Sequence, residues 1–275
     1  MAGLSGLQTR YRRVAELGPG NSWGTGLAAV LSGADEYVAV DVVRYASETT
    51  NLHVLDELVN LFVRRAGIPD VTEFPRATPL LPTYSFPNQI LTPQVLEASL
   101  APRRLDAVRE ALKSGESGDR SVRIKYLTCW DEASEADRGT LDLVFSQAVM
   151  EHVDEVDDTY RGLYQWLRPG GVMSHTIDFR SHGLTQDWNG HWTVPDPTWR
   201  FVRGKRPYLI NRWSHSAHIR SMQRAGFRIA SSMVVEEGLS LARENLAPRF
   251  RKLSDDDLRT CVAFIQAVKP VTSTL

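Results

Sequence analysis

The sequence contains little cysteine and no long apolar segment, and both absences exclude classes of protein. Its two cysteines among 275 residues, Cys129 and Cys261, are too few for a disulfide scaffold or for a zinc site made of cysteine. No uninterrupted apolar run approaches the roughly 20 residues that a membrane-spanning helix needs, and the N-terminus lacks the apolar core of a secretory signal. We therefore expect a cytoplasmic protein with no membrane partner.

The sequence also lacks an excess of charge of either sign. It has 32 Lys and Arg residues against 33 Asp and Glu residues, a formal net charge of −1. Because this balance gives no general attraction to polyanions, we expect no nucleic acid as a partner. With 42% hydrophobic residues the chain is long enough to bury a sizeable core, which predicts one globular domain with an embellishment.

Short β-branched runs alternate with longer helical patterns along the chain. This alternation is typical of a parallel sheet with crossover helices, an α/β fold. The predicted strands are Arg13–Leu17, Tyr37–Asp41, Ser121–Leu127, Leu141–Ser146, Gly171–Ile177, Phe227–Val235 and Cys261–Val268. The predicted helices are Ser22–Leu31, Asn51–Ala66, Leu96–Leu112 with a break at Pro102, and Ser214–Ala225.

One connection is much longer than the others. About eighty residues separate the second strand from the third, whereas a whole βαβ unit needs roughly 30. Seven of the 14 prolines fall in this gap. We predict that residues 51–117 form an inserted helical cap or lid over the carboxyl ends of the strands, and that residues 1–50 and 118–275 form the main domain. A surface excursion unrelated to the site is the alternative.

A glycine-rich turn follows the first predicted strand and leads into a helix. It reads Glu16-Leu-Gly18-Pro19-Gly20, and Asp41 ends the next strand about twenty residues later. Glycines allow a tight turn and bring backbone amides close to a ligand at a helix N-terminus. A carboxylate at the end of the second strand is placed to accept both hydroxyls of a ribose. The pattern predicts a nucleoside-binding crevice.

The spacing of this turn does not fit a dinucleotide. In G-x-G-x-x-G the third glycine lets the backbone approach a pyrophosphate, but here Trp23 holds that position and Gly24 falls one place late. Glu16 has no role beside a pyrophosphate, whereas it suits a cofactor that carries cationic groups and no phosphate. At this point the sequence resembles the class I S-adenosylmethionine-dependent methyltransferases, whose first motif is an acid followed by G-x-G.

Three further segments extend the resemblance in the same order along the chain. Residues 141–153 (LDLVFSQAVMEHV) are similar to the fourth strand of that family and the segment after it, residues 167–172 (LRPGGV) to the turn before the fifth strand, and residues 224–227 (RAGF) to the helix end before the sixth. The resemblance implies a Rossmann-like seven-stranded methyltransferase sandwich, with the helical, Pro-rich insertion after the second strand, and S-adenosyl-L-methionine as cofactor.

The resemblance also implies roles for individual residues. Those expected to contact the cofactor are Glu16, Gly18, Pro19, Gly20, Asp41, Val42, Trp130, Asp131, Ser146 and Gln147. Asp131 would lie near the adenine amino group, although Trp130 could equally be part of the core. Family members usually have one or two helices before the first strand, and here only about a dozen residues precede it. The insertion is therefore the expected source of part of the cofactor lid.

The fifth predicted strand ends in residues suited to the reacting centre. A protein base helps when a hydroxyl must lose its proton, and histidine titrates near neutrality. We hypothesise that Asp178 and His182 contact the acceptor and that one of them is the base, with His152 as the competing base. A hydrogen-bonded packing role is the alternative for each histidine. Asp178, His182 and His191 match no recognised metal spacing, so no metal is predicted.

A basic stretch follows this segment. No Asp or Glu occurs between Pro197 and Val235, whereas eight Arg and Lys residues do, with tryptophans in or beside the stretch. Guanidinium groups beside aromatic walls suit an anionic or ring-bearing acceptor, such as a phosphorylated sugar or an aromatic acid. The residues expected to bind the acceptor are His175, Arg180, Arg203 and Arg206. The alternative is that the arginines only solvate a helix.

The sequence thus predicts methyl transfer from S-adenosylmethionine to a small molecule, most readily at oxygen. Three other functions remain open at this stage: a non-catalytic S-adenosylmethionine-binding protein, a nucleic-acid methyltransferase, and a nicotinamide oxidoreductase. A homodimer is also left open.

Overall fold

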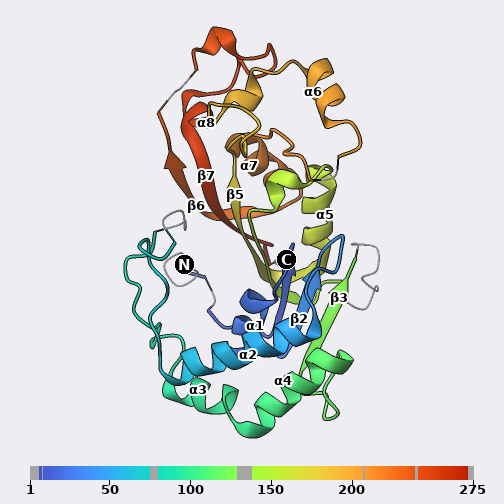
Figure 1. Cartoon of the computed structure of the whole chain (residues 1–275), viewed down its shortest axis with the longest axis vertical. Coiled ribbons are helices and arrows are strands. Elements are labelled where there is room, and N and C mark those ends of the chain that lie inside the picture. The colour runs from blue at the N-terminus through green and yellow to red at the C-terminus, as the bar shows by residue number, and fades with distance from the viewer. Residues whose placement is uncertain are drawn as a thin grey trace.

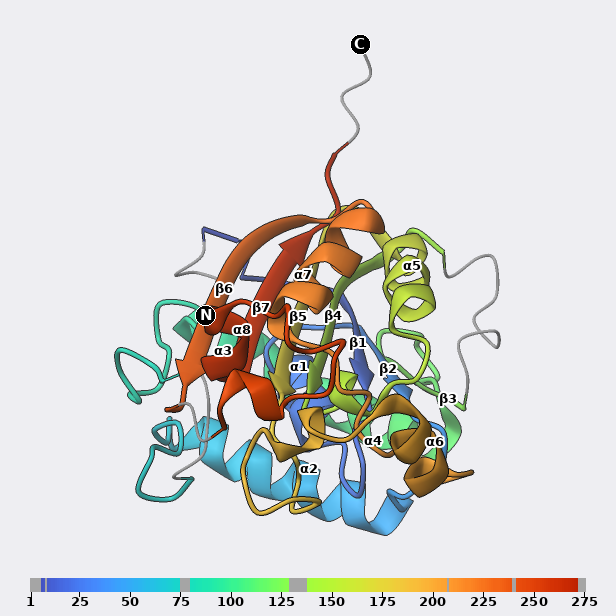
Figure 2. The same ribbon diagram turned by 90° about the horizontal axis from the view of Figure 1, so that it is seen from above.

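The computed structural model describes residues 6–7, 9–74, 80–128, 138–206, 208–238 and 241–271. Seven strands form one sheet in the order β3-β2-β1-β4-β5-β7-β6. Strands β1 to β5 are parallel, and β7 runs antiparallel to both β5 and β6 (Figures 1 and 2). The strands are β1 (Arg13–Leu17), β2 (Glu36–Val40), β3 (Arg123–Leu127), β4 (Leu141–Gln147), β5 (Leu167–Asp178), β6 (Arg228–Glu236) and β7 (Thr260–Val268). The predicted seven-stranded α/β sandwich is confirmed.

The described helices lie on the two faces and around one edge of this sheet. They are α1 (Gly24–Leu31), α2 (Glu48–Val63), α3 (Pro93–Ser99), α4 (Pro102–Ser114), α5 (Val156–Trp166), α6 (Asp196–Arg203), α7 (His215–Arg224) and α8 (Asp255–Arg259), with 3-10 turns η4 (Met150–His152), η5 (Gly190–Trp192) and η6 (Arg243–Asn245). No helix within the described ranges is long and apolar enough to cross a membrane.

Helix ends follow local capping chemistry. Helix α2 begins three residues before the predicted Asn51, because the Ser47 side chain accepts a hydrogen bond from Thr50 N and caps the helix. The predicted helix Leu96–Leu112 is two helices, since Pro102 takes the first position of α4 and cannot donate within α3. Gly115 then ends α4 in the left-handed conformation at φ +88°.

Two apolar clusters cover opposite faces of the sheet. Alternate side chains of a strand point to opposite faces; accordingly Val14 and Tyr37 join one cluster, while Ala15 and Val38 join the other. The first of these clusters lies under α1, α2 and α4, which gather in the lower half of Figure 1. The second lies under α5 and α7, which pack side by side in Figure 2.

Part of the segment predicted as an insertion belongs to the core. Helix α4 precedes β3 in the crossover from β2, and its buried residues join Leu55 of α2 in the cluster that contains α1: Ala107, Val108, Ala111 and Leu112. Helices α2 and α4 thus pack in the same apolar cluster as α1. The division of the chain into a main domain and an inserted cap or lid at residues 51–117 stays a prediction.

A third, smaller cluster lies beyond the carboxyl end of β5. Trp192 of η5 is fully buried against Leu246, Phe250 and Leu258, and its carbonyl accepts a hydrogen bond from Ala247 N at 2.9 Å. The segment after β5 is thus tied to the segment before β7, and together they enclose the edge of the sheet where the predicted site lies.

Candidate active site

The glycine turn joins β1 to α1 at the carboxyl edge of the sheet. Gly18 and Gly20 have φ angles of +62° and +66°, in the left-handed region that favours glycine. Gly18 N donates to Val40 O at 2.8 Å, which holds the turn against the end of β2. A Cβ on Gly18 would lie 2.6 Å from Val149 Cγ2, whereas no described atom lies within 4 Å of a Cβ on Gly20. The second glycine therefore faces open space into which a ligand can approach.

Asp41 lies immediately after β2, beside this turn. Its carboxylate accepts hydrogen bonds from Val42 N at 2.8 Å and from Gly20 N at 3.3 Å. Val42 itself is 58% exposed. A half-buried carboxylate beside an open glycine turn has free acceptor capacity for a diol, and an exposed valine beside it offers an apolar surface for a base. This arrangement can hold a nucleoside.

The start of α1 is closed by a residue that sequence reasoning missed. Asn51 of α2 is fully buried, and its Oδ1 accepts a hydrogen bond from Trp23 N at 3.0 Å. The Trp23 ring stacks on Tyr126 with 6.0 Å between centroids, and the Arg44 guanidinium lies 5.4 Å from the centre of the Trp23 ring. These contacts hold helix α2 against the glycine turn. An asparagine at a helix start gives no signal of this contact in the sequence.

Glu16 lies deeper than the turn it precedes. It is 7% exposed, and its carboxylate accepts a hydrogen bond from the Tyr37 hydroxyl at 2.7 Å. Burial raises the pKa of Glu16 to about 7, although the bond from Tyr37 opposes the rise. Its expected contact with the cofactor stays a prediction.

The end of β4 carries two residues expected to contact the cofactor, and they differ in exposure. Gln147 is exposed at the end of the strand. Ser146 is buried, and its hydroxyl lies 2.7 Å from Nδ1 of His175, which is fully buried itself. Burial lowers the pKa of His175 to about 3, so the ring is neutral. The expected contact of His175 with the acceptor stays a prediction.

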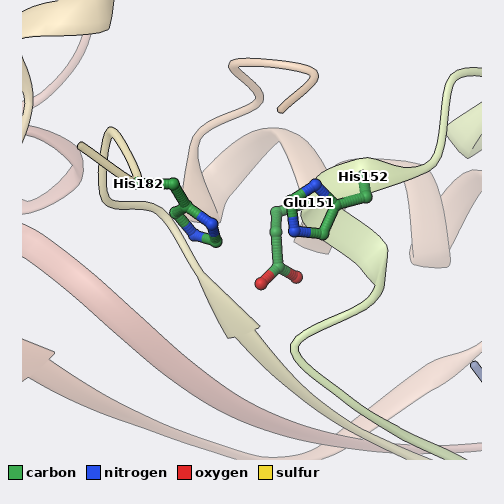
Figure 3. Close-up of side chains that lie close together, drawn as sticks. All are labelled: Glu151, His152 and His182. Atoms are coloured by element: carbon green, nitrogen blue, oxygen red, sulfur yellow. The ribbon is translucent and has the colours of Figure 1, made fainter. Parts of the chain in front are cut away.

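Four titratable side chains come together where β4 and β5 end. Glu151 and His152 lie on η4 after β4, and Asp178 and His182 lie at and beyond the end of β5 (Figure 3). The rings of His152 and His182 are 5.0 Å apart between centroids, and His182 Nε2 lies 3.8 Å from Asp178 Oδ2. The structure therefore groups all three predicted catalytic residues and adds Glu151, which sequence reasoning did not single out.

Burial shifts the ionisation of two members of this group. Burial raises the pKa of Glu151 to about 8, and the nearby charge of Asp178 adds to the rise. Burial lowers the pKa of His152, while its contact with the Tyr208 carbonyl opposes the change. At neutral pH the group therefore offers neutral imidazole and a carboxyl that gives up its proton reluctantly, which suits proton transfer or ligation.

The glycine turn and this group share one edge of the sheet. Since β1, β2, β4 and β5 are parallel, their carboxyl ends meet there, and Leu17 pairs with both Val40 and Ser146. Residues 86–174, less than half of the chain, match the family model described as a methyltransferase domain. The match includes β3, β4 and most of β5. Over this segment the chain is similar to the methyltransferase domain family.

Solved structures of methyltransferases resemble this chain at low sequence identity. One from Methanosarcina mazei is 10% identical, with 96% of this chain and 95% of that chain covered and a TM-score of 0.47. One from Mesorhizobium loti is 13% identical, with 93% and 90% covered and a TM-score of 0.43. Phosphoethanolamine N-methyltransferase 2 of Haemonchus contortus, in complex with S-adenosyl-L-methionine, is 15% identical, with 97% and 50% covered and a TM-score of 0.45. No curated protein matches the sequence.

Two of the three arginines expected to bind the acceptor pair with carboxylates of the protein. Arg180 pairs with Glu237 at 2.9 Å and with Asp178 at 3.4 Å. Arg203 pairs with Asp154. Arg206 is exposed after α6. Trp130 and Asp131, expected near the adenine, lie outside the described residues.

A cavity of about 300 Å³ lies against α7, apart from the four-residue group. Trp213, Phe250 and three smaller residues line the cavity together with four arginines. The arginines are Arg212, Arg220, Arg224 and Arg249. Arg212 and Arg249 both pair with Asp196, and Arg224 pairs with Asp157. The basic stretch found in the sequence supplies three of these arginines, and carboxylates of α6 and α5 pair with two of them, Arg212 and Arg224.

Proposed function

We propose that the chain is an S-adenosylmethionine-dependent methyltransferase, which transfers the methyl group to an oxygen of a small-molecule acceptor bound at the group formed by Glu151, His152, Asp178 and His182. One observation carries this proposal: the glycine turn touches the segment that leads into the group. A Cβ on Gly18 would meet Val149, which directly precedes η4. The glycine turn and the group of four titratable side chains are therefore neighbours.

The distance between the two regions suits direct transfer. Neighbouring strands lie about 4.8 Å apart, and β1 and β5 are separated only by β4. The carboxyl ends of β1 and β5 are thus roughly 10 Å apart across the sheet. An adenosyl ligand that sits on the turn and reaches along the edge would end beside the group.

For this reaction the protein must position the acceptor hydroxyl and accept its proton. The cofactor supplies an electrophilic methyl group on a sulfonium. The acceptor oxygen forms a bond to that carbon as the carbon–sulfur bond breaks, and the hydroxyl proton passes to the protein. Asp178 is 28% exposed and lies beside His182, so this pair can orient a hydroxyl and receive its proton.

Three features favour a small acceptor with ring or anionic character. The net charge of −1 gives no attraction to nucleic acid. The segment after β5, which contains Trp188 and Trp192, is held in place by the third apolar cluster. The basic residues near α6 supply exposed cations such as Arg206. A protein that only binds the cofactor would have no use for the titratable group, which argues against the non-catalytic alternative.

The test separates cofactor binding from transfer. We expect His182→Ala to bind S-adenosylhomocysteine like the wild type in calorimetry and to lose at least 100-fold in turnover on a panel of hydroxylated small acceptors. His53→Ala is the matched control, since His53 is exposed on α2 and pairs only with Glu57. Full turnover in His182→Ala would remove the group from the acceptor site. Tight binding of S-adenosylhomocysteine without turnover on any acceptor class would favour the non-catalytic alternative.

A further inference from the structure

Glu151 is a buried carboxyl group without a side-chain partner. It is 3% exposed, and no side chain within the described part of the chain hydrogen-bonds to either of its oxygens, although the backbone amides of Glu151 and Asp178 lie near enough to lower its pKa. Burying a polar group without a partner costs several kcal/mol, and buried charges are normally paired or coordinate metals. The carboxylate points between the rings of His152 and His182 (Figure 3). A cation between these side chains would satisfy it.

The His152 ring is already oriented for ligation. Its Nδ1 lies 2.6 Å from the Tyr208 carbonyl oxygen. Because a carbonyl only accepts, Nδ1 carries the hydrogen and Nε2 keeps its lone pair free. A ring nitrogen that donates to a backbone carbonyl while the other binds the ion is the usual support of a metal-binding histidine.

The His182 ring is held by a strained backbone. His182 has φ +52°, which a non-glycine residue adopts at a cost of about 1 kcal/mol or more. This conformation brings its ring edge-on to His152, with 5.0 Å between centroids. Asp178 Oδ2, at 3.8 Å from His182 Nε2, places a second carboxyl group beside the same point.

We propose that Glu151, His152 and His182 bind one divalent transition-metal ion. Each residue offers one ligand atom, and these atoms lie within 4.8 Å of one another. In a tetrahedral zinc site with bonds of about 2.1 Å, ligand atoms are about 3.4 Å apart, so side-chain rotation needs to close at most about 1.4 Å. Two imidazoles and one carboxylate suit zinc, manganese or iron and leave coordination positions open.

This set of ligands was not predicted from the sequence. The sequence analysis considered Asp178, His182 and His191 as metal ligands, but the structure does not bring His191 to the others. His191 is 2% exposed and packs against Trp192 with 5.0 Å between ring centroids. Glu151 takes its place because η4 turns back under the end of β5.

The role of the ion in catalysis rests on the proposed function. An ion in this position would coordinate the acceptor oxygen at an open site and lower the pKa of the hydroxyl, so that its proton leaves to Asp178 or to water before the oxygen attacks the methyl carbon. In that case His182 would be a metal ligand, and the ion, instead of His182, would activate the acceptor hydroxyl.

Metal binding by the full-length chain tests the proposal without cofactor or acceptor. Protein treated with chelator and dialysed is titrated with ZnCl2 and with MnCl2 in a calorimeter, and CoCl2 is added to record the visible absorption of a coordinated ion. We expect one ion per chain. Glu151→Gln, which keeps size and removes charge, and His182→Ala should each weaken binding at least tenfold.

His53→Ala supplies the matched control, because His53 and Glu57 form an exposed pair at 3.2 Å that could bind metal weakly. Its affinity should equal that of the wild type. Equal affinity in the wild type, Glu151→Gln and His182→Ala would overturn the metal site. Should Glu151→Gln fail to fold, His182→Ala carries the test, since His182 is 30% exposed. Turnover that persists in metal-free protein refutes the catalytic role of the ion alone, whereas metal binding without turnover on any acceptor counts against the proposed function alone.

Discussion

Replacing Gly20 by alanine tests whether the glycine turn is the cofactor cradle. The change places a methyl group at φ +66°, a conformation that costs an L-residue about 1–2 kcal/mol. No described atom lies within 4 Å of the new Cβ, so no steric clash adds to this cost. We therefore expect the free energy of unfolding to fall by about 1 kcal/mol.

The effect on cofactor affinity should be larger than the effect on stability. The new methyl group fills the open space beside Asp41, where the backbone must approach the ligand. Displacing a ligand from one close contact costs about 1.4 kcal/mol or more, which is a tenfold rise in Kd. Gly139→Ala is the matched control, because Gly139 has φ +68° and an equally open Cβ position but lies at the amino end of β4.

Calorimetry with S-adenosylhomocysteine and urea unfolding measure the two effects on the same preparations. Both variants should lose similar stability, and only Gly20→Ala should lose affinity. If Gly20→Ala binds S-adenosylhomocysteine as tightly as Gly139→Ala does, the open space beside Gly20 is not part of the cofactor site. Gly18→Ala gives a further reference, since its Cβ would also collide with Val149 at 2.6 Å and should cost more stability than either.

Three other substitutions test the packing beneath the site. Between pH 4.5 and about 7 the folded chain keeps the Glu16 proton that the unfolded chain releases, so the free energy of unfolding falls by up to about 3 kcal/mol as the pH rises. Glu16→Gln should therefore flatten the pH dependence of the urea-unfolding free energy from pH 5 to 7.5, and an unchanged slope would contradict this. Gly26→Ala should lower the unfolding free energy by about 3 kcal/mol, because its Cβ would lie 2.0 Å from the Tyr37 ring, and a loss under 0.5 kcal/mol would refute the clash. Asn51→Ala leaves Trp23 N without its acceptor and should cost about 2 kcal/mol together with weaker S-adenosylhomocysteine binding; stability loss with full affinity would show that α2 does not support the turn.

The seven strands and the glycine turn could be predicted from the sequence, because both leave local marks. Buried parallel strands are continuous apolar runs, and the turn needs glycine at positive φ, as Gly18 and Gly20 have. The predicted boundaries differ from the observed ones where a cap decides, as at Ser47 of α2.

Contacts between distant segments could not be predicted in the same way. Asn51 reads as an ordinary polar residue of a helix, and its bond to Trp23 exists only because α2 packs on α1. Glu151 sits beside a residue that the pattern did single out, yet its burial depends on how η4 packs against β5. Helix α4 did carry a signal, since Ala107, Val108 and Ala111 line one helical face, but the long proline-rich connection suggested an insertion instead.

The position of β7 constrains how the chain can be made. It lies between β5 and β6 and is the last of the seven strands along the chain. During synthesis, the edges of β5 and β6 that pair with β7 therefore stay unpaired until Thr260–Val268 has been made. A nascent chain stopped short of this strand exposes two unsatisfied backbone edges, so a premature stop late in the message should yield an aggregating or rapidly degraded product rather than a slightly shortened enzyme.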